Sequence, residues 1–333
     1  MTRLAVVGAG LIGSRHIRAV QQNPDCTLVA VVEPDAARTA GLDVPVYARI
    51  EDVQEAADGA IIASPTPLHP DHVRAAAARG WGVLIEKPVA DSLAEADALI
   101  ATVKGARVAS LVGHHRRHHQ SVALLRRIVT EGRIGQPVLA TLIWAMKKPD
   151  AYFEGNWRSG GGGSPVMINL VHDIDLLRFL FGEVTEVAAV GGAPVRDADR
   201  VESGAVALSF AGGVSATLAF ADTTPSPWGF EAGTGENPNI ARSGQNMLWI
   251  AGTEGGVAFP SLHVWSGAAD WSETPVNARE GAPATDPLAA QLRHFLDVIT
   301  GRAEPLIDAE DARKTLAVAL QIETALARAR EAA

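Results

Sequence analysis

Lys87 can act as an acid or base near neutral pH when its pKa is lowered, and the residues around it in the sequence favour such a role. It follows the apolar run "WGVLIE" and precedes Pro88, which disfavours helical geometry for the residue before it, so its ammonium should be aimed from the end of a strand into a cleft. Partial burial lowers the pKa of a lysine and lets it exchange a proton with a hydroxyl group. The alternative is a structural salt bridge between Lys87 and Glu86.

His172 is the second candidate for proton transfer, and it lies in a helix predicted over 165–181. Ser164 is a suitable N-cap, Pro165 suits the first helical position, and Gly182 should end the helix. By three- and four-residue spacing, the residues that share one side of this helix with His172 are Ile168, Asn169, Asp175 and Leu176.

Two carboxylates, Asp173 and Asp175, closely follow His172 in the sequence. A carboxylate can orient an imidazole ring or raise its pKa, which favours an acid–base role for His172. The alternative is a histidine whose hydrogen bonds are satisfied inside an apolar core.

The segment "HHRRHH", residues 114–119, holds four of the ten histidines and two arginines. A metal site requires converging histidines, but adjacent residues at the end of a strand point to opposite sides, so at most two would converge. Nucleic acid is disfavoured because the chain is acidic and no aromatic residues are interleaved. We interpret the segment as a pocket wall, with His114 or Arg116 facing the reacting groups and the rest solvated or interfacial.

A glycine-rich turn joins the first predicted strand and helix in "LAVVGAGLIGSRHIRAV". In this G-x-G-x-x-G spacing, Gly8 allows a tight turn, Gly10 lets a pyrophosphate approach the backbone, and Gly13 lets the helix pack closely on the strand. The helix N-terminus favours anions through its unpaired N–H groups and its dipole. The pattern predicts a dinucleotide site.

Glu33 ends the second predicted strand, "CTLVAVVEPD", about 20 residues beyond the glycines. An acidic residue at this point accepts hydrogen bonds from the ribose hydroxyls of NAD and repels the 2′-phosphate of NADP. The alternative for Glu33 is a solvated strand end, and Arg38 could still reach a 2′-phosphate. We favour NAD over NADP.

Strands and helices alternate through about residue 120. Beyond the glycine turn, the predicted strands are "GAIIAS" (59–64), "WGVLIEKP" (81–88) and "ARVASLVGHH" (106–115), and the predicted helices are 68–79 and 92–104, the latter capped by Ser92. This alternation indicates βαβ units and a parallel sheet, in which ligands bind beyond the carboxyl ends of the strands. The segments "SPTPLH" (64–69), "EKP" (86–88) and the start of "HHRRHH" should therefore share one rim.

The pattern changes beyond residue 120. A helix over 120–131 and the strand "QPVLATLIWAMKK" precede the helix of His172, and further strands are predicted in "EVTEVAAVGG", "ESGAVALSF", "GVSATLAFAD" and "NMLWIAGTEGGVAFP". Glycine pairs at 212–213 and 255–256 are typical of hairpins and indicate an antiparallel sheet. Helices over 287–300 and 308–331 close the chain.

The segment 223–245, "TTPSPWGFEAGTGENPNIARSGQ", has no clear period and is too long for a simple connection. It carries Trp228, Phe230, Glu231 and Arg242, which a mere linker would not need. We hypothesise a lid in which Trp228 offers an apolar face and Glu231 or Arg242 binds hydroxyl groups. The alternative is a surface excursion or a contact between subunits.

Length and composition limit the classes of protein to which the chain can belong. Its 333 residues indicate two domains, and a net charge of −9 argues against nucleic acid as a partner. A single cysteine, Cys26, fits a reducing compartment. Without a leader sequence or an apolar run near the ~20 residues of a membrane span, the sequence predicts a soluble, cytoplasmic protein with no membrane partner.

Several ordered motifs together resemble the glucose–fructose oxidoreductase, inositol dehydrogenase and MocA family of NAD(P)-dependent dehydrogenases. The resemblance covers essentially the whole chain, and its carriers are "VGAGLIGSRHI", "SPTPLHPDHV", "GWGVLIEKPVA", "LVGHHRR", "GGGGSPVMINLVHDIDLLRFL" and "PLIDAEDARKTLAVALQIETA". It implies an α/β fold with an N-terminal Rossmann domain (1–120) and a C-terminal α/β domain (121–333). The large, mainly antiparallel open sheet of the second domain would mediate homo-oligomerisation.

The resemblance also implies roles for individual residues. Lys87 matches the lysine of the family's "EKP" motif, and His172 matches its catalytic histidine. Many members have an aspartate four residues before that histidine, where this chain has Ile168. Asn169 can substitute as a hydrogen-bond donor to the substrate but cannot take up a proton, so the base must be His172 or Lys87.

These patterns and the resemblance yield three sets of predicted site residues. The catalytic set is Lys87 and His172. The substrate set is Asn169, His114, Arg116, Asp173, Trp157, Arg158, Trp228, Glu231 and Arg242. The cofactor set is Gly8, Gly10, Leu11, Ile12, Gly13, Glu33, Ser64, Pro65, Thr66, His69, Glu86 and Lys87, and no metal is expected.

The predicted reaction is reversible oxidation of a secondary alcohol of a sugar or cyclitol, with NAD as the hydride acceptor and His172, aided by Lys87, removing the hydroxyl proton. Correct positioning of the reacting atoms and acid–base catalysis would supply the rate enhancement. Alternatives on the same framework are an NAD-dependent glycosidase and a dihydrodiol dehydrogenase. A non-catalytic NAD-binding sensor is a further alternative.

Overall fold

The computed structural model describes residues 1–153, 164–196, 200–283 and 286–331, which form two compact units. The first unit comprises residues 1–118 and 286–317, and the second comprises residues 119–285 and 318–333. The chain passes from the first unit to the second after residue 118. It then returns, because helix α7 (Pro287–Ile299) and the first part of α8 (Ala309–Glu331) group with the N-terminal residues.

The first unit is built on a six-stranded sheet in the order β3-β2-β1-β4-β5-β6, and every pairing in it is parallel. The strands are β1 (Thr2–Val7), β2 (Cys26–Val32), β3 (Val46–Tyr47), β4 (Gly59–Ile62), β5 (Gly82–Ile85) and β6 (Ser110–Val112). This is the strand order of dinucleotide-binding folds. The predicted parallel sheet is confirmed, and only the two-residue β3 was not predicted.

Helices complete the βαβ units of this sheet. They are α1 (Leu11–Gln22), α2 (His69–Ala78) and α3 (Leu93–Ala106), with α7 and the start of α8. The Ser92 hydroxyl accepts a hydrogen bond from the Glu95 N–H at 3.2 Å, which confirms the predicted N-cap of α3. Strands β1, β4 and β5 are almost wholly buried, as continuous apolar runs in a parallel sheet should be.

The second unit is built on an eight-stranded sheet in the order β14-β13-β12-β11-β7-β10-β9-β8. Its strands are β7 (Pro137–Ala145), β8 (Val184–Gly191), β9 (Ser203–Phe210), β10 (Ser215–Ala221), β11 (Leu248–Gly252), β12 (Gly255–Phe259), β13 (His263–Ser266) and β14 (Val276–Arg279). All pairs are antiparallel except β7 with β10, so the mainly antiparallel sheet is confirmed. The pair Gly212–Gly213 does form a hairpin turn, but Gly255 and Gly256 belong to β12.

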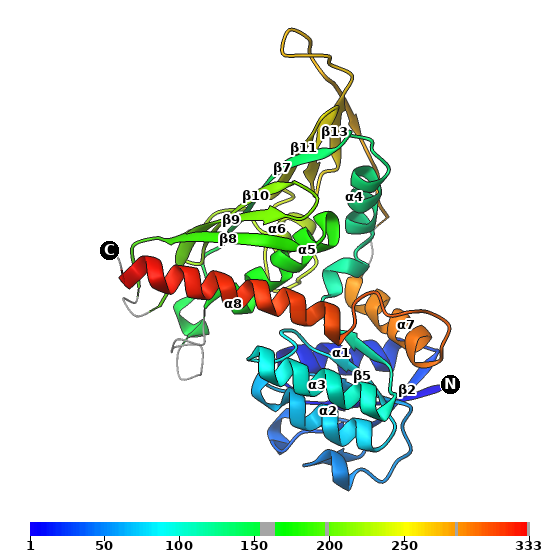
Figure 1. Ribbon diagram of the computed structural model, residues 1–333. Helices are drawn as coiled ribbons and strands as arrows, with labels where there is room; N and C mark the ends of the chain where they lie inside the picture. Colours follow the sequence, from blue (N-terminus) through cyan, green and yellow to red (C-terminus); the bar gives the residue numbers. More distant parts are fainter. Residues whose placement is uncertain (154–163, 197–199, 284–285, 332–333) are drawn as a thin grey trace. The chain divides into compact units, whose positions relative to one another are not determined.

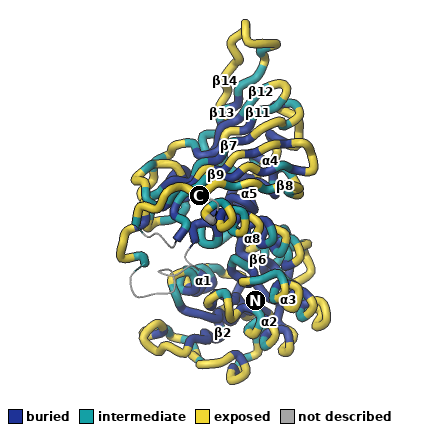
Figure 2. Tube along the Cα trace, turned by 60° about the vertical axis from the view of Figure 1, so that its left-hand side comes forward, coloured by how far each residue is buried: buried dark blue, intermediate teal, exposed yellow. Residues whose placement is uncertain are grey.

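Helices cover one face of this sheet (Figure 1). Side chains of α4 (Gln120–Thr130), α5 (Val171–Phe181), the short α6 (Phe230–Thr234) and the end of α8 share an apolar core with the inward-facing residues of the strands. The β13–β14 end projects beyond the helices, and its connecting loop is exposed (Figure 2). In the described ranges, no helix has the length and apolar character needed to cross a membrane.

Candidate functional site

Packing explains Gly8 and Gly13 of the turn between β1 and α1, and leaves Gly10 open. Gly8 has a φ of 94°, and a Cβ there would lie 2.7 Å from the Ala63 carbonyl oxygen. A Cβ on Gly13 would collide with the carbonyl oxygen of Gly8. A Cβ on Gly10 would meet only Arg38, at 3.9 Å, so this side of the turn is open. The turn therefore fits a pyrophosphate approaching at Gly10.

The start of α1 suits the same ligand. Gly10 is its N-cap residue and supplies no side-chain cap, and the first turn, beginning with Leu11 and Ile12, carries no acidic residue. Backbone N–H groups at an uncapped helix start can bind a phosphate.

Glu33 lies against the glycine turn. One carboxylate oxygen accepts a hydrogen bond from the Ala9 N–H at 2.8 Å, and the other accepts from the Asp35 N–H at 3.1 Å. Arg38 Nη1 is 3.9 Å from the carboxylate. These contacts fix the acidic group beside the dinucleotide turn, and they leave an arginine within reach of it.

The segment after β4, with Ser64, Pro65 and Thr66, is tied to the segment after β5 by a buried histidine. His69 Nε2 is 3.0 Å from the Ser64 carbonyl oxygen, and His69 Nδ1 is 3.3 Å from the Val89 carbonyl oxygen. Burial lowers the pKa of His69. Its ring is thus occupied by backbone groups of both segments, which join at one rim as predicted.

Glu86 and Lys87 follow β5 at this rim. One oxygen of the Glu86 carboxylate is 2.7 Å from His16 Nε2, and the other accepts a hydrogen bond from the Lys87 N–H at 3.2 Å. Burial raises the pKa of Glu86, but the hydrogen bond and the charge of His16 outweigh this effect and hold it at about 2. The carboxylate is therefore charged, and it anchors the backbone of Lys87.

In the second unit, the helix of His172 begins differently from the prediction. The Ser164 hydroxyl accepts a hydrogen bond from the Val166 N–H at 3.1 Å, which confirms the cap, and the helix ends at Gly182. However, Val166–Leu170 is a π-helix, and α5 begins at Val171. The uniform α-helix predicted over 165–181 was therefore wrong at 166–170, where the turn is π-helical.

The polar residues of this helix are buried to different degrees. His172, Asp173 and Asp175 are buried in α5, whereas Asn169 is half-buried. The Asn169 side-chain oxygen is shielded from solvent and has no hydrogen-bond partner among the described residues. A buried acceptor of this kind can bind a donor such as a hydroxyl group.

The "HHRRHH" segment is not a strand end. Strand β6 ends at Val112, and His115–His118 is a 3₁₀ turn, so the argument from alternating strand directions was wrong. His114 and Arg116 are each 1% exposed. Within the described portion of the chain, no group of three or more His, Cys, Asp or Glu side chains is arranged to hold a metal ion.

The rest of this segment was expected to be solvated or interfacial, and a solvated position was wrong for Arg117 and His119. Arg117 is buried and forms an ion pair with Asp311 at 2.7 Å. His119 is buried as the N-cap of α4, and its ring meets the edge of Phe230 with 5.7 Å between centroids. These side chains stabilise the fold around them.

The middle of the segment 223–245 is part of the core of the second unit. Phe230 of α6 is fully buried and stacks on Phe259, and the Ala145 N–H donates to the Trp228 carbonyl oxygen at 2.7 Å. The buried Glu231 carboxylate accepts a hydrogen bond from the Trp144 indole at 3.3 Å. The expected absence of regular structure was therefore wrong at 230–234.

Other predicted substrate residues differ in their surroundings. The side chains of Trp228 and Arg242 remain exposed. Trp157 and Arg158 lie outside the described residues.

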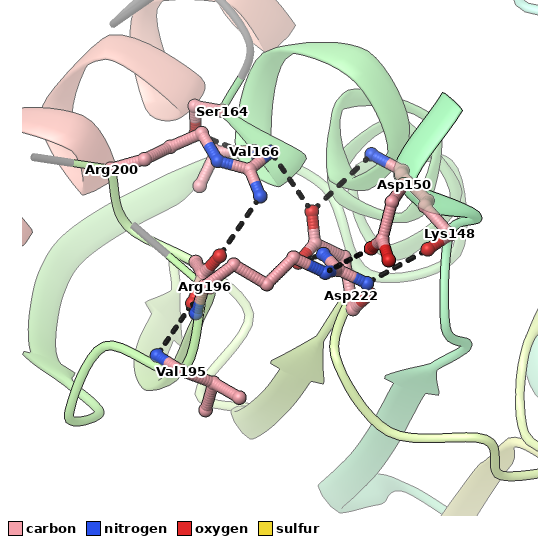
Figure 3. A network of polar contacts seen from close by, with 9 residues as sticks. Lys148, Asp150, Ser164, Val166, Val195, Arg196, Arg200 and Asp222 are labelled. Carbon is pink, nitrogen blue, oxygen red and sulfur yellow. Dashed lines mark hydrogen bonds and ion pairs between the residues drawn. The ribbon is translucent and has the colours of Figure 1, made fainter. Parts of the chain in front are cut away.

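An ion network around Asp222 was not predicted from the sequence (Figure 3). Its carboxylate is fully buried, with Arg196 Nη1 at 3.0 Å, Arg200 Nη1 at 3.3 Å and Lys148 Nζ at 3.8 Å. Arg200 also pairs with the buried Glu202 at 3.1 Å. The network ties the chain after β7 to the chain after β10.

The parallel pairing of β7 with β10 explains this network. The carboxyl ends of parallel strands meet at one edge, so Lys148 and Asp222, each just beyond its strand, come together there. Charged residues just after two apolar strands, Lys148 and Asp222, were a sequence signal for an ion pair. Using this signal requires knowledge of which strands pair.

Two family models match the chain. The first, "Oxidoreductase family, NAD-binding Rossmann fold", matches residues 2–114, and the second, "GFO/IDH/MocA C-terminal domain", matches residues 122–258. The chain is 33% identical to an inositol 2-dehydrogenase of Rhizobium meliloti over 65% of this chain and 67% of the relative. It is 27% identical to a 1,5-anhydro-D-fructose reductase of Ensifer adhaerens over 98% of this chain and 97% of the relative.

Solved structures share the fold across nearly the whole chain. An oxidoreductase from Agrobacterium radiobacter, in complex with NAD+, L-tartaric acid and magnesium, has a TM-score of 0.81 at 17% identity, covering 98% of this chain and 96% of that one. A UDP-N-acetylglucosamine 3-dehydrogenase from Acidithiobacillus ferrooxidans has a TM-score of 0.80 at 23% identity, covering 98% of each chain. These likenesses concern the fold.

Proposed function

Since the chain belongs to the GFO/IDH/MocA family of oxidoreductases, we propose that it oxidises a secondary alcohol of a sugar or cyclitol. It is an NAD(P)-dependent dehydrogenase with an NAD-binding Rossmann domain. The observation that carries the substrate class is the likeness to an inositol 2-dehydrogenase across two thirds of that relative. Polar residues able to bind several hydroxyl groups support it.

The glycine turn and Glu33 would hold the dinucleotide. The uncapped start of α1 would bind its phosphates, and the Glu33 carboxylate would accept hydrogen bonds from the ribose hydroxyls. The same negative charge would repel a 2′-phosphate, so NAD is preferred over NADP. When bound, NAD+ accepts a hydride from the carbinol carbon of the substrate.

His172 and Lys87 would manage the hydroxyl proton. His172, with Asp173 beside it in the chain, would remove the proton, and Lys87 would assist by holding or accepting it. Asn169 would bind a substrate hydroxyl through its buried amide oxygen. Further proposed substrate contacts are His114, Arg116, Asp173, Trp157, Arg158, Trp228, Glu231 and Arg242.

The face of the eight-stranded sheet opposite the helices is proposed as the homo-oligomer interface. By strand register it carries Leu139, Val190 and Trp249, which are 50%, 63% and 37% exposed. Exposed apolar residues gathered on one face are typical of interaction surfaces. Light scattering should give a multiple of the chain mass for the wild type and a lower multiple for Leu139→Glu. A wild-type monomer would contradict the proposal.

A panel of polyols, cyclitols and aldoses, scored for NADH formation, tests the proposed reaction. At least one cyclitol or sugar should give sustained NADH production that depends on substrate concentration. Hydrolysis of a glycoside without net NADH would indicate a glycosidase instead, and oxidation of dihydrodiols alone would indicate a dihydrodiol dehydrogenase. NAD binding without turnover on any substrate would indicate a sensor.

A further inference from the structure

We propose that His16 is a positioning residue for Lys87 and acts through the carboxylate of Glu86. The inference rests on the proposed catalytic function of Lys87. It assigns a role to His16, three residues beyond the last glycine of the turn, that the glycine pattern itself does not require.

A continuous chain of hydrogen bonds links the two residues. His16, 1% exposed on the inner side of α1, reaches Glu86 at 2.7 Å, and the other oxygen of the Glu86 carboxylate holds the Lys87 N–H at 3.2 Å. The helix that starts at the dinucleotide turn is thereby connected to the residue that would carry the proton. A displacement of α1 would pass directly to the backbone of Lys87.

Gly113 closes the Glu86 site on a third side. A Cβ at this position would lie 3.0 Å from the Glu86 carboxylate and 3.1 Å from its Cα atom, which is closer than most real contacts allow. The Gly113 N–H also donates to the Ile85 carbonyl oxygen at 2.7 Å, so the backbone cannot easily move away. The carboxylate is therefore held between His16, Lys87 and Gly113.

His16 is the side-chain partner of the Glu86 carboxylate. A buried carboxylate that loses its partner is strongly destabilised or takes up a proton. Besides His16, the ionisable groups whose charges reach Glu86 are Lys87, His115 and His69. With His16 present, the low pKa of Glu86 keeps the carboxylate charged wherever activity is measured, so its stabilising effect is lost only as the pH falls towards 2.

Without His16, burial should raise the pKa of Glu86. As Glu86 becomes protonated, Lys87 loses a neighbouring negative charge that favours its ammonium form, and the pKa of Lys87 should fall. The expected signature is a kcat profile whose Lys87-dependent limb moves to lower pH. A purely structural role for His16 would lower stability and leave that limb in place.

The test compares His16→Leu, His16→Gln and Glu86→Gln by kcat, KM, NAD affinity and the pH profile of kcat. His16→Leu should lower kcat by roughly 10-fold to 100-fold, because misplacement of a reacting group has effects of this size. NAD affinity should stay close to the wild-type value. His16→Gln retains a donor for Glu86 and should recover part of kcat, while Glu86→Gln should shift the pH profile even where His16→Leu fails to fold.

Val20→Ala is the matched control, because Val20 lies one turn further along the same buried side of α1. It should lower stability and leave kcat and the pH profile unchanged. The inference is overturned if Lys87→Ala is inactive while His16→Leu and Glu86→Gln keep the wild-type kcat and profile, or if Val20→Ala changes kcat as much as His16→Leu. Normal turnover by Lys87→Ala would instead contradict the proposed function.

Discussion

The two sheets hold their polar residues by different means. Beyond the parallel sheet, Glu33 and His69 bond to nearby backbone, and Glu86 pairs with His16: Glu33 accepts from the Ala9 N–H, and His69 lies between two carbonyl oxygens. Beyond β7 and β10 of the second sheet, several charged side chains share one carboxylate, that of Asp222. The first region therefore combines backbone contacts with paired side chains, and the second depends on a network of buried charges around one carboxylate.

Replacing the residues proposed for proton transfer, one in each region, should give the largest losses of kcat. Lys87→Ala and His172→Ala should each lower kcat by about 10²–10⁴-fold, the usual contribution of a general acid or base. NAD affinity should be retained, as isothermal titration can show. Asn169→Ala is the comparison variant and should mainly raise KM, because an amide binds a hydroxyl but cannot carry its proton. Near-normal turnover of His172→Ala at every pH would make His172 a core residue.

The charge balance of the second sheet can be broken at Asp222. Asp222→Ala removes the fully buried carboxylate that Lys148, Arg196 and Arg200 share. The loss should lower the free energy of unfolding by about 3–5 kcal/mol. Denaturant unfolding measures this loss. Asp58→Ala is the control, because its ion pair with Arg3 is exposed and should contribute about 1 kcal/mol or less. Equal losses in the two variants would contradict the contrast between the regions.

The backbone shape of the first region can be broken at Gly13. Gly13→Ala places a Cβ against the Gly8 carbonyl oxygen, and such overpacking costs about 1–3 kcal/mol. The turn should distort, and NAD affinity should fall with stability. In Gly105→Ala, where a Cβ meets nothing within 4 Å, both quantities should hold or improve. Unchanged NAD affinity in Gly13→Ala would remove the turn from the cofactor site.

The smallest expected effect concerns the choice of cofactor. Glu33→Ala removes the carboxylate that should repel a 2′-phosphate and leaves Arg38 close by. The preference for NAD over NADP should narrow without loss of binding. Tighter binding of NADP than NAD by the wild type, in direct titrations of both, would contradict the assignment.

The sequence predicted the first region well because its constraints are local. Gly8 and Gly13 are restricted by atoms of the same strand–turn–helix unit and of the segment just after β4. Because parallel strands end at one edge, the rim segments after β4 and β5 could also be brought together in advance.

The second region was predicted less well because its contacts depend on which distant segments pair. Nothing near Lys148 in the sequence indicates Asp222 as its partner. Likewise, Phe230 could not be assigned to the core without Phe259 beside it. The π-helical start of the His172 helix depends on backbone hydrogen bonds such as that from the Val171 N–H to the Val166 carbonyl oxygen, which the pattern of side chains does not reveal.

The most direct test of the account follows deuterium from a substrate into the cofactor. The best substrate of the panel, with myo-inositol as the first choice, would be deuterated at its ring carbons and oxidised with NAD+, and the cofactor would be analysed by mass spectrometry. If the protein oxidises an alcohol with NAD+, deuterium should accumulate in NADH in proportion to the ketone formed. His172→Ala should slow both processes together. If the deuterium instead returned to the product and no deuterated NADH remained, the result would contradict net oxidation of an alcohol.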